Sequence, residues 1–298
     1  MTMLTSLATF LLVAVLVRSS YGAIVQDDSA AEGSSGRLRY FYDDEVANPC
    51  EHLVLLGVGT TTSTSDYDVL STELVTNEPI VAVIVDQNPF WFVKTNANRF
   101  ASFTNAIVEQ LDQIVPVCQS RPPPKQIVIG GHSAGGQAAW NSIPRLSYQP
   151  TGFLGLDPFR LDPNDDSNMD LPGLFWGFTE TSCQVTAGQA AKAGYQASTE
   201  DGRVFYQINN SDGSAAGHCS FTDGGCFGPV CPAAASSSWV RESVAEGTQR
   251  FLKALGEGEW KKESFALDPI DGEQVNLFVN QDVVARRHLA TRYLRGRQ

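Results

Sequence analysis

The chain has 298 residues, of which 42% are hydrophobic, 18% are charged and 10% are aromatic. These proportions are typical of a folded globular protein, and they exclude wholesale disorder, a collagen-like repeat and a coiled coil. The formal net charge of −12 makes a nucleic acid an unfavourable partner, because a polyanion is repelled on average.

The first 22 residues have the pattern of a signal peptide. An apolar run over residues 8–17 is followed by Arg18 and by the small residues Ser20 and Gly22. The run is shorter than the roughly 20 residues of a transmembrane helix and suits the apolar core of a signal peptide. We therefore predict cleavage after Gly22 and export, with the protein secreted or routed to an endomembrane or plastid compartment.

Short apolar, β-branched runs alternate with helix-like stretches in one domain over residues 23–255. The alternation is typical of an α/β fold in which helices cover both faces of a mostly parallel sheet. The predicted strands are residues 38–42, 52–56, 80–85, 126–130, 152–156, 174–178 and 204–208. The predicted helices are residues 66–74, starting after Ser65 as N-cap, 96–117, 137–146 and 238–255.

A C-terminal extension follows, over residues 256–298. Its last sixteen residues carry five arginines and no acid. We expect a solvated tail, and peripheral contact with an anionic lipid surface is the alternative.

The segment Gly131-His132-Ser133-Ala134-Gly135-Gly136 lies between the predicted strand 126–130 and the helix 137–146. It contains the pattern G-x-S-x-G, in which a serine occupies a strained strand-to-helix turn and the small residues let neighbouring backbones approach. Free N–H groups at the start of the helix can stabilise negative charge that develops during acyl transfer. We predict that Ser133 is a nucleophile and that the Ala134 N–H is an oxyanion donor. A tight structural turn is the alternative.

A serine nucleophile needs a base, and the chain has four histidines. His218 follows the last predicted strand, which agrees with the chain order serine, acid, histidine that accompanies this motif. We therefore predict His218 as the base. His132 is expected to pack or hydrogen-bond beside the nucleophile, while His52 begins a strand and His288 lies in the basic tail.

The acid that orients His218 should end a strand between Ser133 and His218. Asp157 follows the predicted strand 152–156 and precedes Pro158, while Glu180 follows the next strand. Either carboxylate can hold an imidazole tautomer. We favour Asp157 and retain Glu180 as the alternative.

A second oxyanion donor should come from the glycine-containing loop after the strand 52–56. In Gly57-Val58-Gly59-Thr60 we predict that the donor is the Val58 N–H, and a plain loop is the alternative.

Further side chains suggest a pocket and a modification site. Phe90, Trp91 and Phe92 follow the strand 80–85 and would line an apolar substrate pocket or pack in the core. Asn209 begins an Asn-Asn-Ser glycosylation sequon. The alternating acidic and amide residues over 162–170 lack the glycine and glutamate of a calcium loop, so we predict no metal and no cofactor.

Six cysteines in an exported chain predict disulfides, because such a chain meets an oxidising compartment. A zinc site is the less favoured alternative, since Cys219, Cys226 and Cys231 contain no CxxC pair. Pairing of Cys226 with Cys231, and of Cys219 with Cys183, would fix the loop that carries His218. The candidates are Cys50, Cys118, Cys183, Cys219, Cys226 and Cys231.

Over roughly residues 50–255 the chain resembles the chlorophyllase-like branch of the α/β-hydrolases, close to lipases and cutinase-type esterases. The matching pieces are residues 131–136, Leu156-Asp157-Pro158, Gly217-His218-Cys219 and the loop from Leu56 to Thr60 with the helix after it. The resemblance implies an α/β-hydrolase fold and a Ser133, Asp157, His218 triad.

Such a protein would be a serine carboxylic-ester hydrolase acting on an ester with an apolar acyl or alcohol part. A secreted lipase or cutinase-like esterase is the alternative among enzymes. Plant chlorophyllases usually have Arg at the position of Ala134, so this chain departs from them beside the nucleophile. A catalytically inactive binding protein with the same fold is the alternative from another class.

Overall fold

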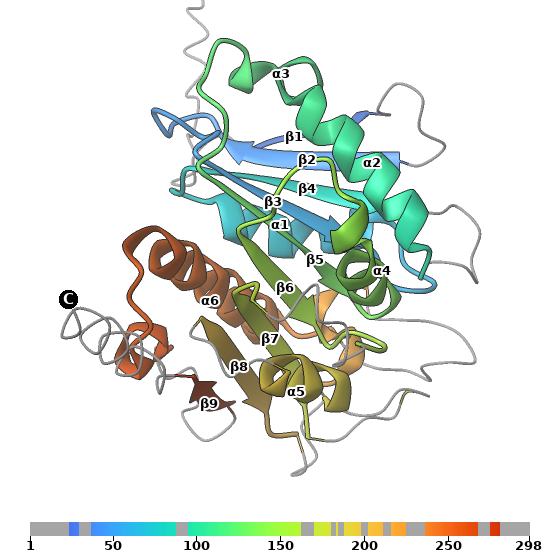
Figure 1. The fold of residues 1–298 in the computed structure, drawn as a ribbon, viewed down its shortest axis with the longest axis vertical. Coiled ribbons are helices and arrows are strands. Elements are labelled where there is room, and N and C mark those ends of the chain that lie inside the picture. Colours follow the sequence, from blue (N-terminus) through green and yellow to red (C-terminus); the bar gives the residue numbers. More distant parts are fainter. Residues whose placement is uncertain are drawn as a thin grey trace, which may run out of the picture.

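The structure is a computed structural model that describes residues 24–29, 37–87, 95–161, 170–179, 183, 188–197, 202–210, 216–224, 236–267 and 275–280. These residues form a mixed α/β fold around one sheet of nine strands (Figure 1). The strands are β1 (Ile24–Ser29), β2 (Arg37–Asp43), β3 (His52–Gly57), β4 (Ile80–Asp86), β5 (Gln126–His132), β6 (Gly152–Leu156), β7 (Gly173–Phe178), β8 (Arg203–Ile208) and β9 (Val275–Val279).

The strand order across the sheet is β1-β2-β4-β3-β5-β6-β7-β8-β9. The six strands from β4 to β8 in this order are parallel, whereas β1, β2 and β9 pair antiparallel with their neighbours. The mostly parallel sheet and all seven predicted strands are therefore confirmed. Strands β1 and β9, at the two edges of the sheet, were not predicted from the sequence.

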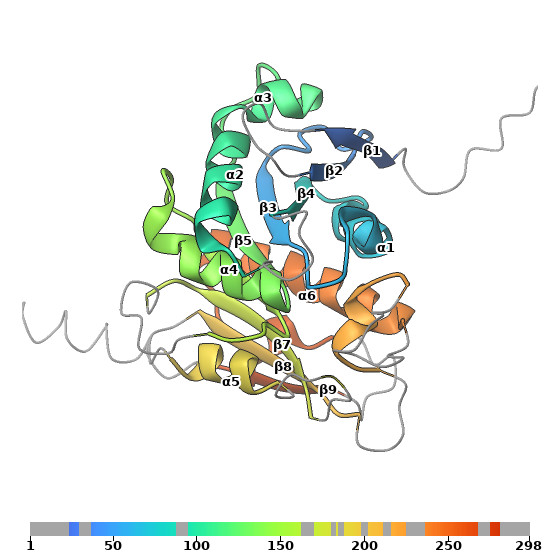
Figure 2. The ribbon, with the colours of Figure 1, turned by 90° about the vertical axis from the view of Figure 1, so that its right-hand side faces the viewer.

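Helices cover both faces of the sheet, as predicted (Figure 2). One face packs against α1 (Asp68–Val75) and α6 (Ser238–Glu257), through buried side chains such as Leu74 and Val244. The other face packs against α2 (Ala97–Glu109), α4 (Ala134–Ser142) and α5 (Gln189–Gln196). In β5, Val128 faces the first group and Ile129 faces the second, so an unbroken apolar run is needed to fill both sides.

Three helix predictions needed correction. The helix predicted over 137–146 is α4, which begins at Ala134 and ends at Ser142. The helix predicted over 96–117 is broken at Gln110, whose φ of −117° is not helical, into α2 and the short α3 (Leu111–Ile114). It ends before Pro116, because a residue that precedes proline is disfavoured in the helical region. The helix predicted from 66 begins as a 3₁₀ turn, η1 (Thr64–Tyr67), capped by Ser63 rather than Ser65. Helix α5 was not predicted.

One disulfide joins Cys50, before β3, to Cys118, after α3, and it closes a sequence separation of 68 residues. Cys183 and Cys219 each take part in a disulfide as well, and the pairings of Cys219 with Cys183 and of Cys226 with Cys231 stay predictions. Cys226 and Cys231 lie outside the described residues, as do the predicted signal peptide and the basic tail. No helix in the described part of the chain is long and apolar enough to cross a membrane.

The register of the parallel strands brings three strand ends level with one another. Gly57 of β3 pairs with Gly131 of β5, and His132 of β5 pairs with Leu156 of β6. The residues that follow these strands therefore meet at the carboxyl edge of the sheet, where open α/β sheets place their ligand sites.

Candidate active site

Ser133 lies on a sharp turn between β5 and α4. Its φ of 52° and ψ of −121° fall in a region that residues with a side chain rarely adopt, and its neighbours hold it there. The Ser133 N–H donates to the Leu156 carbonyl over 3.1 Å, and the Ser133 carbonyl accepts from the Phe159 N–H over 2.9 Å. Backbone strain that the surrounding structure enforces in this way is typical of functional sites.

Strained residues gather at this edge of the sheet. Five non-glycine residues have a positive φ within the described ranges, and three of them, Thr61, Ser133 and Asp157, follow β3, β5 and β6. The other two, Asn77 and Ser120, lie in turns elsewhere. Three strained residues on adjacent strand ends indicate that this edge is the functional one.

The glycines around Ser133 are needed because three backbones cross here at close range. A Cβ atom on Gly135 would lie 2.2 Å from the Gly57 carbonyl oxygen, and one on Gly131 would lie 2.5 Å from the same atom. Neither contact can be relieved by a side-chain movement. The end of β3 therefore packs directly against the start of α4, and the loop after β3 passes beside Ser133.

Asp157 and His218 form a buried hydrogen-bonded pair. The His218 Nδ1 atom lies 2.7 Å from the Asp157 Oδ2 atom, and the two side chains are 3% and 2% exposed. The other carboxylate oxygen of Asp157 accepts the Gly188 N–H over 3.1 Å. With Nδ1–H donated to a carboxylate, the Nε2 atom of a neutral imidazole is left as an acceptor.

The structure thus gathers Ser133, Asp157 and His218 at one edge of the sheet. Within the described residues no hydrogen bond joins the Ser133 hydroxyl to the His218 ring; such contacts are often long in a free enzyme and tighten when substrate binds. The ring of His218 lies beside that of His132, with 4.7 Å between the centroids, so the predicted base lies next to the residue that precedes Ser133.

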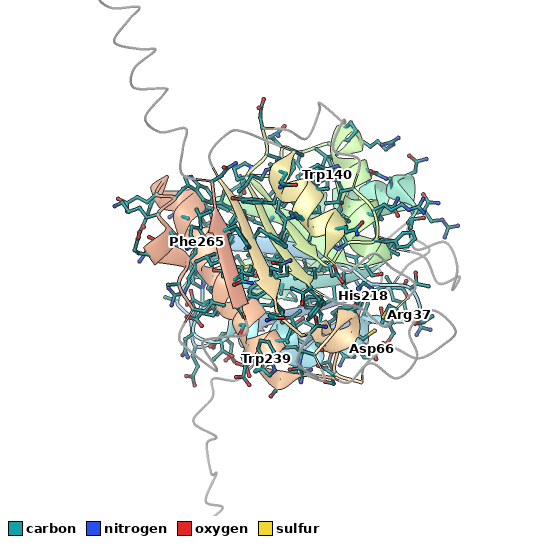
Figure 3. All side chains as sticks on the ribbon, turned by 90° about the horizontal axis from the view of Figure 1, so that it is seen from below. Arg37, Asp66, Trp140, His218, Trp239 and Phe265 are labelled. Carbon is teal, nitrogen blue, oxygen red and sulfur yellow. A yellow bond between two sulfur atoms is a disulfide. The ribbon has the colours of Figure 1, made fainter. Side chains whose placement is uncertain are left out.

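His218 begins the 3₁₀ turn η5 (His218–Phe221), which two helices hold in place. The Asp223 N–H donates to the Asp66 carbonyl over 2.8 Å, and the Asp223 carboxylate accepts the Val69 N–H at the start of α1. From α6, Arg241 donates to the Thr222 carbonyl and pairs with Asp223 over 3.4 Å. Figure 3 shows His218 and Asp66 on the same side of the molecule.

The prediction that the Val58 N–H is an oxyanion donor is wrong. This group already donates to the Val85 carbonyl, which extends the β3–β4 ladder by one residue, and to the Gln87 side chain, both over 3.2 Å. The Gly59 N–H donates to the Tyr67 hydroxyl. Thr60 is the first residue of this loop whose N–H has no acceptor among the described residues.

The predicted donor Ala134 fits its role. It is the first residue of α4, where backbone N–H groups have no partner within the helix, and it directly follows Ser133. The loop that carries Thr60 passes beside the Ser133 side chain, because a Cβ on Gly59, the preceding residue, would be 3.4 Å from the Ser133 Cβ.

Several predicted residues fall outside the described ranges. They are Glu180, the alternative acid, and the aromatic residues Phe90, Trp91 and Phe92. Asn209 is described, is half-buried, and accepts a hydrogen bond from the Thr179 hydroxyl over 3.3 Å. No cluster of three metal-ligating side chains occurs in the part of the chain that the structure describes.

Four residues that support the site were not predicted from the sequence, namely Tyr67, Gln87, Gly188 and Asp223. Each acts on a residue far away in the chain, such as Gln87 on Val58 and Gly188 on Asp157. No local pattern marks such contacts.

Compared with protein-family models and with curated proteins, the sequence matches none.

Proposed function

We propose that this chain is a serine hydrolase of the α/β-hydrolase fold that cleaves carboxylic esters. The observation that carries the proposal is the buried Asp157–His218 pair beside a serine on a strained strand-to-helix turn. The chain order of Ser133, Asp157 and His218 supports it, since this order accompanies the G-x-S-x-G turn in that fold.

In the proposed reaction the Ser133 oxygen attacks the ester carbonyl carbon, and the Ser133 proton passes to His218. The leaving alcohol takes that proton as the tetrahedral intermediate collapses to an acyl-enzyme. Water then attacks the acyl group and gives a proton to His218, which passes that proton to the Ser133 oxygen as the acid is released and the serine is regenerated. Asp157 holds the imidazole orientation and stabilises the imidazolium that forms in each half.

The negative charge of each intermediate is placed between the N–H groups of Ala134 and Thr60. Both groups are fixed before substrate arrives, so no reorganisation is needed when charge develops. The start of α4 adds the positive end of the helix dipole.

For the substrate we propose an ester with an apolar acyl or alcohol part, with a chlorophyllase-like activity first and a lipase or cutinase-like activity second. The support is the resemblance of residues 131–136, 156–158 and 217–219 to the chlorophyllase-like branch. A panel of p-nitrophenyl esters of graded chain length, assayed beside chlorophyll a, decides between these activities. A protein that hydrolyses none of them is not the proposed esterase.

The nucleophile is tested by covalent labelling. A fluorophosphonate probe should label the purified protein at Ser133, because only an activated hydroxyl reacts at a useful rate. Ser133→Ala should abolish labelling, and peptide mapping should locate the adduct. Ser142→Ala, which changes a buried serine of α4 whose hydroxyl donates to the Ala139 carbonyl, is the matched control and should leave labelling intact. Labelling that persists in Ser133→Ala would contradict the proposal.

A further inference from the structure

A continuous chain of hydrogen bonds runs beneath the proposed nucleophile, from the loop after β3 to the segment that carries His218. The Gly59 N–H lies 3.0 Å from the Tyr67 hydroxyl, and that hydroxyl lies 2.8 Å from the His132 Nδ1 atom. On the other side of the ring, the His132 Nε2 atom lies 2.8 Å from the His218 carbonyl oxygen. The ester hydrolysis described above uses neither Tyr67 nor His132.

The direction of this chain follows from its two ends. The His218 carbonyl can only accept, so the His132 Nε2 atom must carry the proton. The Nδ1 atom of the neutral ring then accepts, and the Tyr67 hydroxyl must donate to it. The Tyr67 oxygen in turn accepts the Gly59 N–H, so every bond points from the loop toward His218.

Burial keeps the hydrogen bonds in this one direction, because it keeps both Tyr67 and His132 uncharged. Tyr67 and His132 are each 1% exposed. Burial holds the pKa of His132 well below its usual value, with the nearby His218 acting in the same direction, and burial raises the pKa of Tyr67. A neutral imidazole and a neutral phenol are therefore the stable forms around pH 7.

The two ends of this series of hydrogen bonds lie on the two backbone segments whose spacing matters most for the proposed chemistry. Gly59 directly precedes Thr60, the proposed oxyanion donor, and the accepting carbonyl belongs to His218 itself. His132 directly precedes Ser133. Acyl transfer needs such groups held within about 0.5 Å, and elements fixed by buried hydrogen bonds provide that better than loops alone.

We propose that Tyr67 and His132 are positioning residues that fix the distance between the oxyanion donor and the base across Ser133. The inference rests on the proposed function, since it assigns a role within that reaction. Neither residue touches substrate. Tyr67 sets the loop after β3, His132 sets the His218 segment, and the Tyr67–His132 bond joins the two.

The first test separates transition-state binding from substrate binding. In Tyr67→Phe the Gly59 N–H, the Thr62 hydroxyl and the His132 Nδ1 atom lose their shared partner. We expect kcat for a p-nitrophenyl ester to fall about tenfold, and a trifluoromethyl ketone inhibitor, whose adduct carries an oxyanion, to bind about tenfold more weakly. KM should stay within about twofold, because the substrate pocket is not changed.

Tyr206→Phe is the matched control. Tyr206 is also 1% exposed and its hydroxyl donates to the Phe265 carbonyl over 2.6 Å. Phe265 is well separated from His218 in Figure 3. The control should lower the melting temperature by a similar amount and leave kcat and inhibitor affinity unchanged. Equal kcat losses in Tyr67→Phe and Tyr206→Phe, or no loss in Tyr67→Phe, would overturn the proposal.

A double-mutant cycle tests whether the two residues act through one bond. In His132→Gln the side-chain amide can still donate to the His218 carbonyl but no longer accepts from Tyr67. Tyr67→Phe and His132→Gln therefore remove the same bond, and the double variant should be no slower than the slower single variant. Losses in kcat that multiply would show that the bond is not shared.

One measurement needs no variant, so the positioning role can be tested even if a variant does not fold. The positioning role and the proposed function are also contradicted by different results. In the wild-type protein, ¹⁵N NMR of the imidazole rings at pH 7 should show His132 neutral with its proton on Nε2; an imidazolium or a proton on Nδ1 would overturn the proposal. Loss of the fluorophosphonate label in Ser133→Ala tests the esterase assignment alone, whereas the Tyr67→Phe and Tyr206→Phe comparison tests the positioning role alone.

Discussion

At the scale of single residues, two hydrogen bonds fix the orientation of the Asp157 carboxylate toward His218. Its Oδ2 atom takes the His218 ring and its Oδ1 atom takes the Gly188 N–H, so the carboxylate plane cannot rotate. Gly188 has a φ of +55°, and a Cβ there would lie 2.5 Å from the Phe178 carbonyl oxygen, so only glycine fits this donor position. The orientation of His218 thus depends on the start of α5 as well as on β6.

Changing this carboxylate to an amide should remove most of the activity. Asp157→Asn no longer holds the proton on the His218 Nδ1 atom, and the loss of the correct tautomer costs kcat about 10⁴-fold in a well-studied triad. We expect a loss of that order in ester hydrolysis, with a far-UV circular dichroism spectrum like that of the wild type. Glu180→Gln is the comparison and should cost much less. The opposite ranking would give the role to Glu180.

The proposed donor at Thr60 can be tested through the backbone. Thr60→Pro removes the N–H, whereas Thr60→Ala keeps it and removes only the side chain. We expect Thr60→Pro to lower kcat by about 10²-fold to 10³-fold, the usual cost of one oxyanion donor, and Thr60→Ala to change it by a few-fold. Both variants are first checked for a wild-type melting curve. Similar kcat values in the two variants would move the donor elsewhere.

The sequence could predict which residues the structure brings together in the candidate site, but not their backbone partners. Ser133 and Asp157 directly follow apolar strands and His218 comes later, after β8, so pattern and chain order pointed to all three. Val58 was the wrong donor because the ladder between β3 and β4 continues one residue past the apolar run, and the end of a ladder leaves no mark in the sequence. Tyr67 contacts a residue 65 positions away, which no local pattern can show.

At the scale of elements, the His218 segment is held by α1 and α6 as well as by its own side chains. Asp223 receives the Val69 N–H of α1 and faces Arg241 of α6. Asp223→Ala removes both contacts, and the loss of a helix-terminal acceptor alone costs about 1 kcal/mol. We expect kcat/KM to fall about fivefold to tenfold, with a melting temperature lowered by only a few degrees.

The control for this variant changes an ion pair at the amino ends of the parallel strands, the opposite edge of the sheet from His218. Glu51→Gln breaks the exposed contact between Lys125 and Glu51, 2.7 Å long, before β3 and β5 begin. Exposed pairs contribute about 0–1 kcal/mol, so the variant should keep full activity and nearly full stability. If Asp223→Ala keeps wild-type kcat/KM, the two helices do not position His218.

Prediction of elements succeeded where both faces of a strand are buried and failed at the edges. The strands β3 to β8 are rich in apolar residues because helices cover both of their faces, and such runs are visible in the sequence. In β9 Phe278 is 42% exposed and the strand pairs on one side only, with β8. Four of its five residues are apolar, but the strand is short and none of its residues is buried, so its pattern does not mark it as a strand of the sheet.

At the scale of the whole molecule, the buried His132 and the half-buried His52 should make stability depend on pH. Burial is the main cause that lowers the pKa of both His132 and His52, and His132 is much the more strongly shifted. In the unfolded chain both rings return to an ordinary pKa near 6.5. Below that pH the unfolded state binds protons that the folded state does not, so the free energy of unfolding falls as the pH decreases.

The two histidines should contribute unequally to this loss. Between pH 6.5 and 5.5 a fully buried neutral histidine can cost up to about 1.4 kcal/mol per pH unit, which applies to His132. The half-buried His52 should cost a fraction of that, because water still screens its ring. We expect melting temperatures measured at pH 7.5, 6.5 and 5.5 to fall most steeply in the wild type, less in His52→Gln and least in His132→Gln. Parallel curves for the three proteins would mean that His132 takes up a proton in the folded state, and the direction assigned to its hydrogen-bond chain would then be wrong.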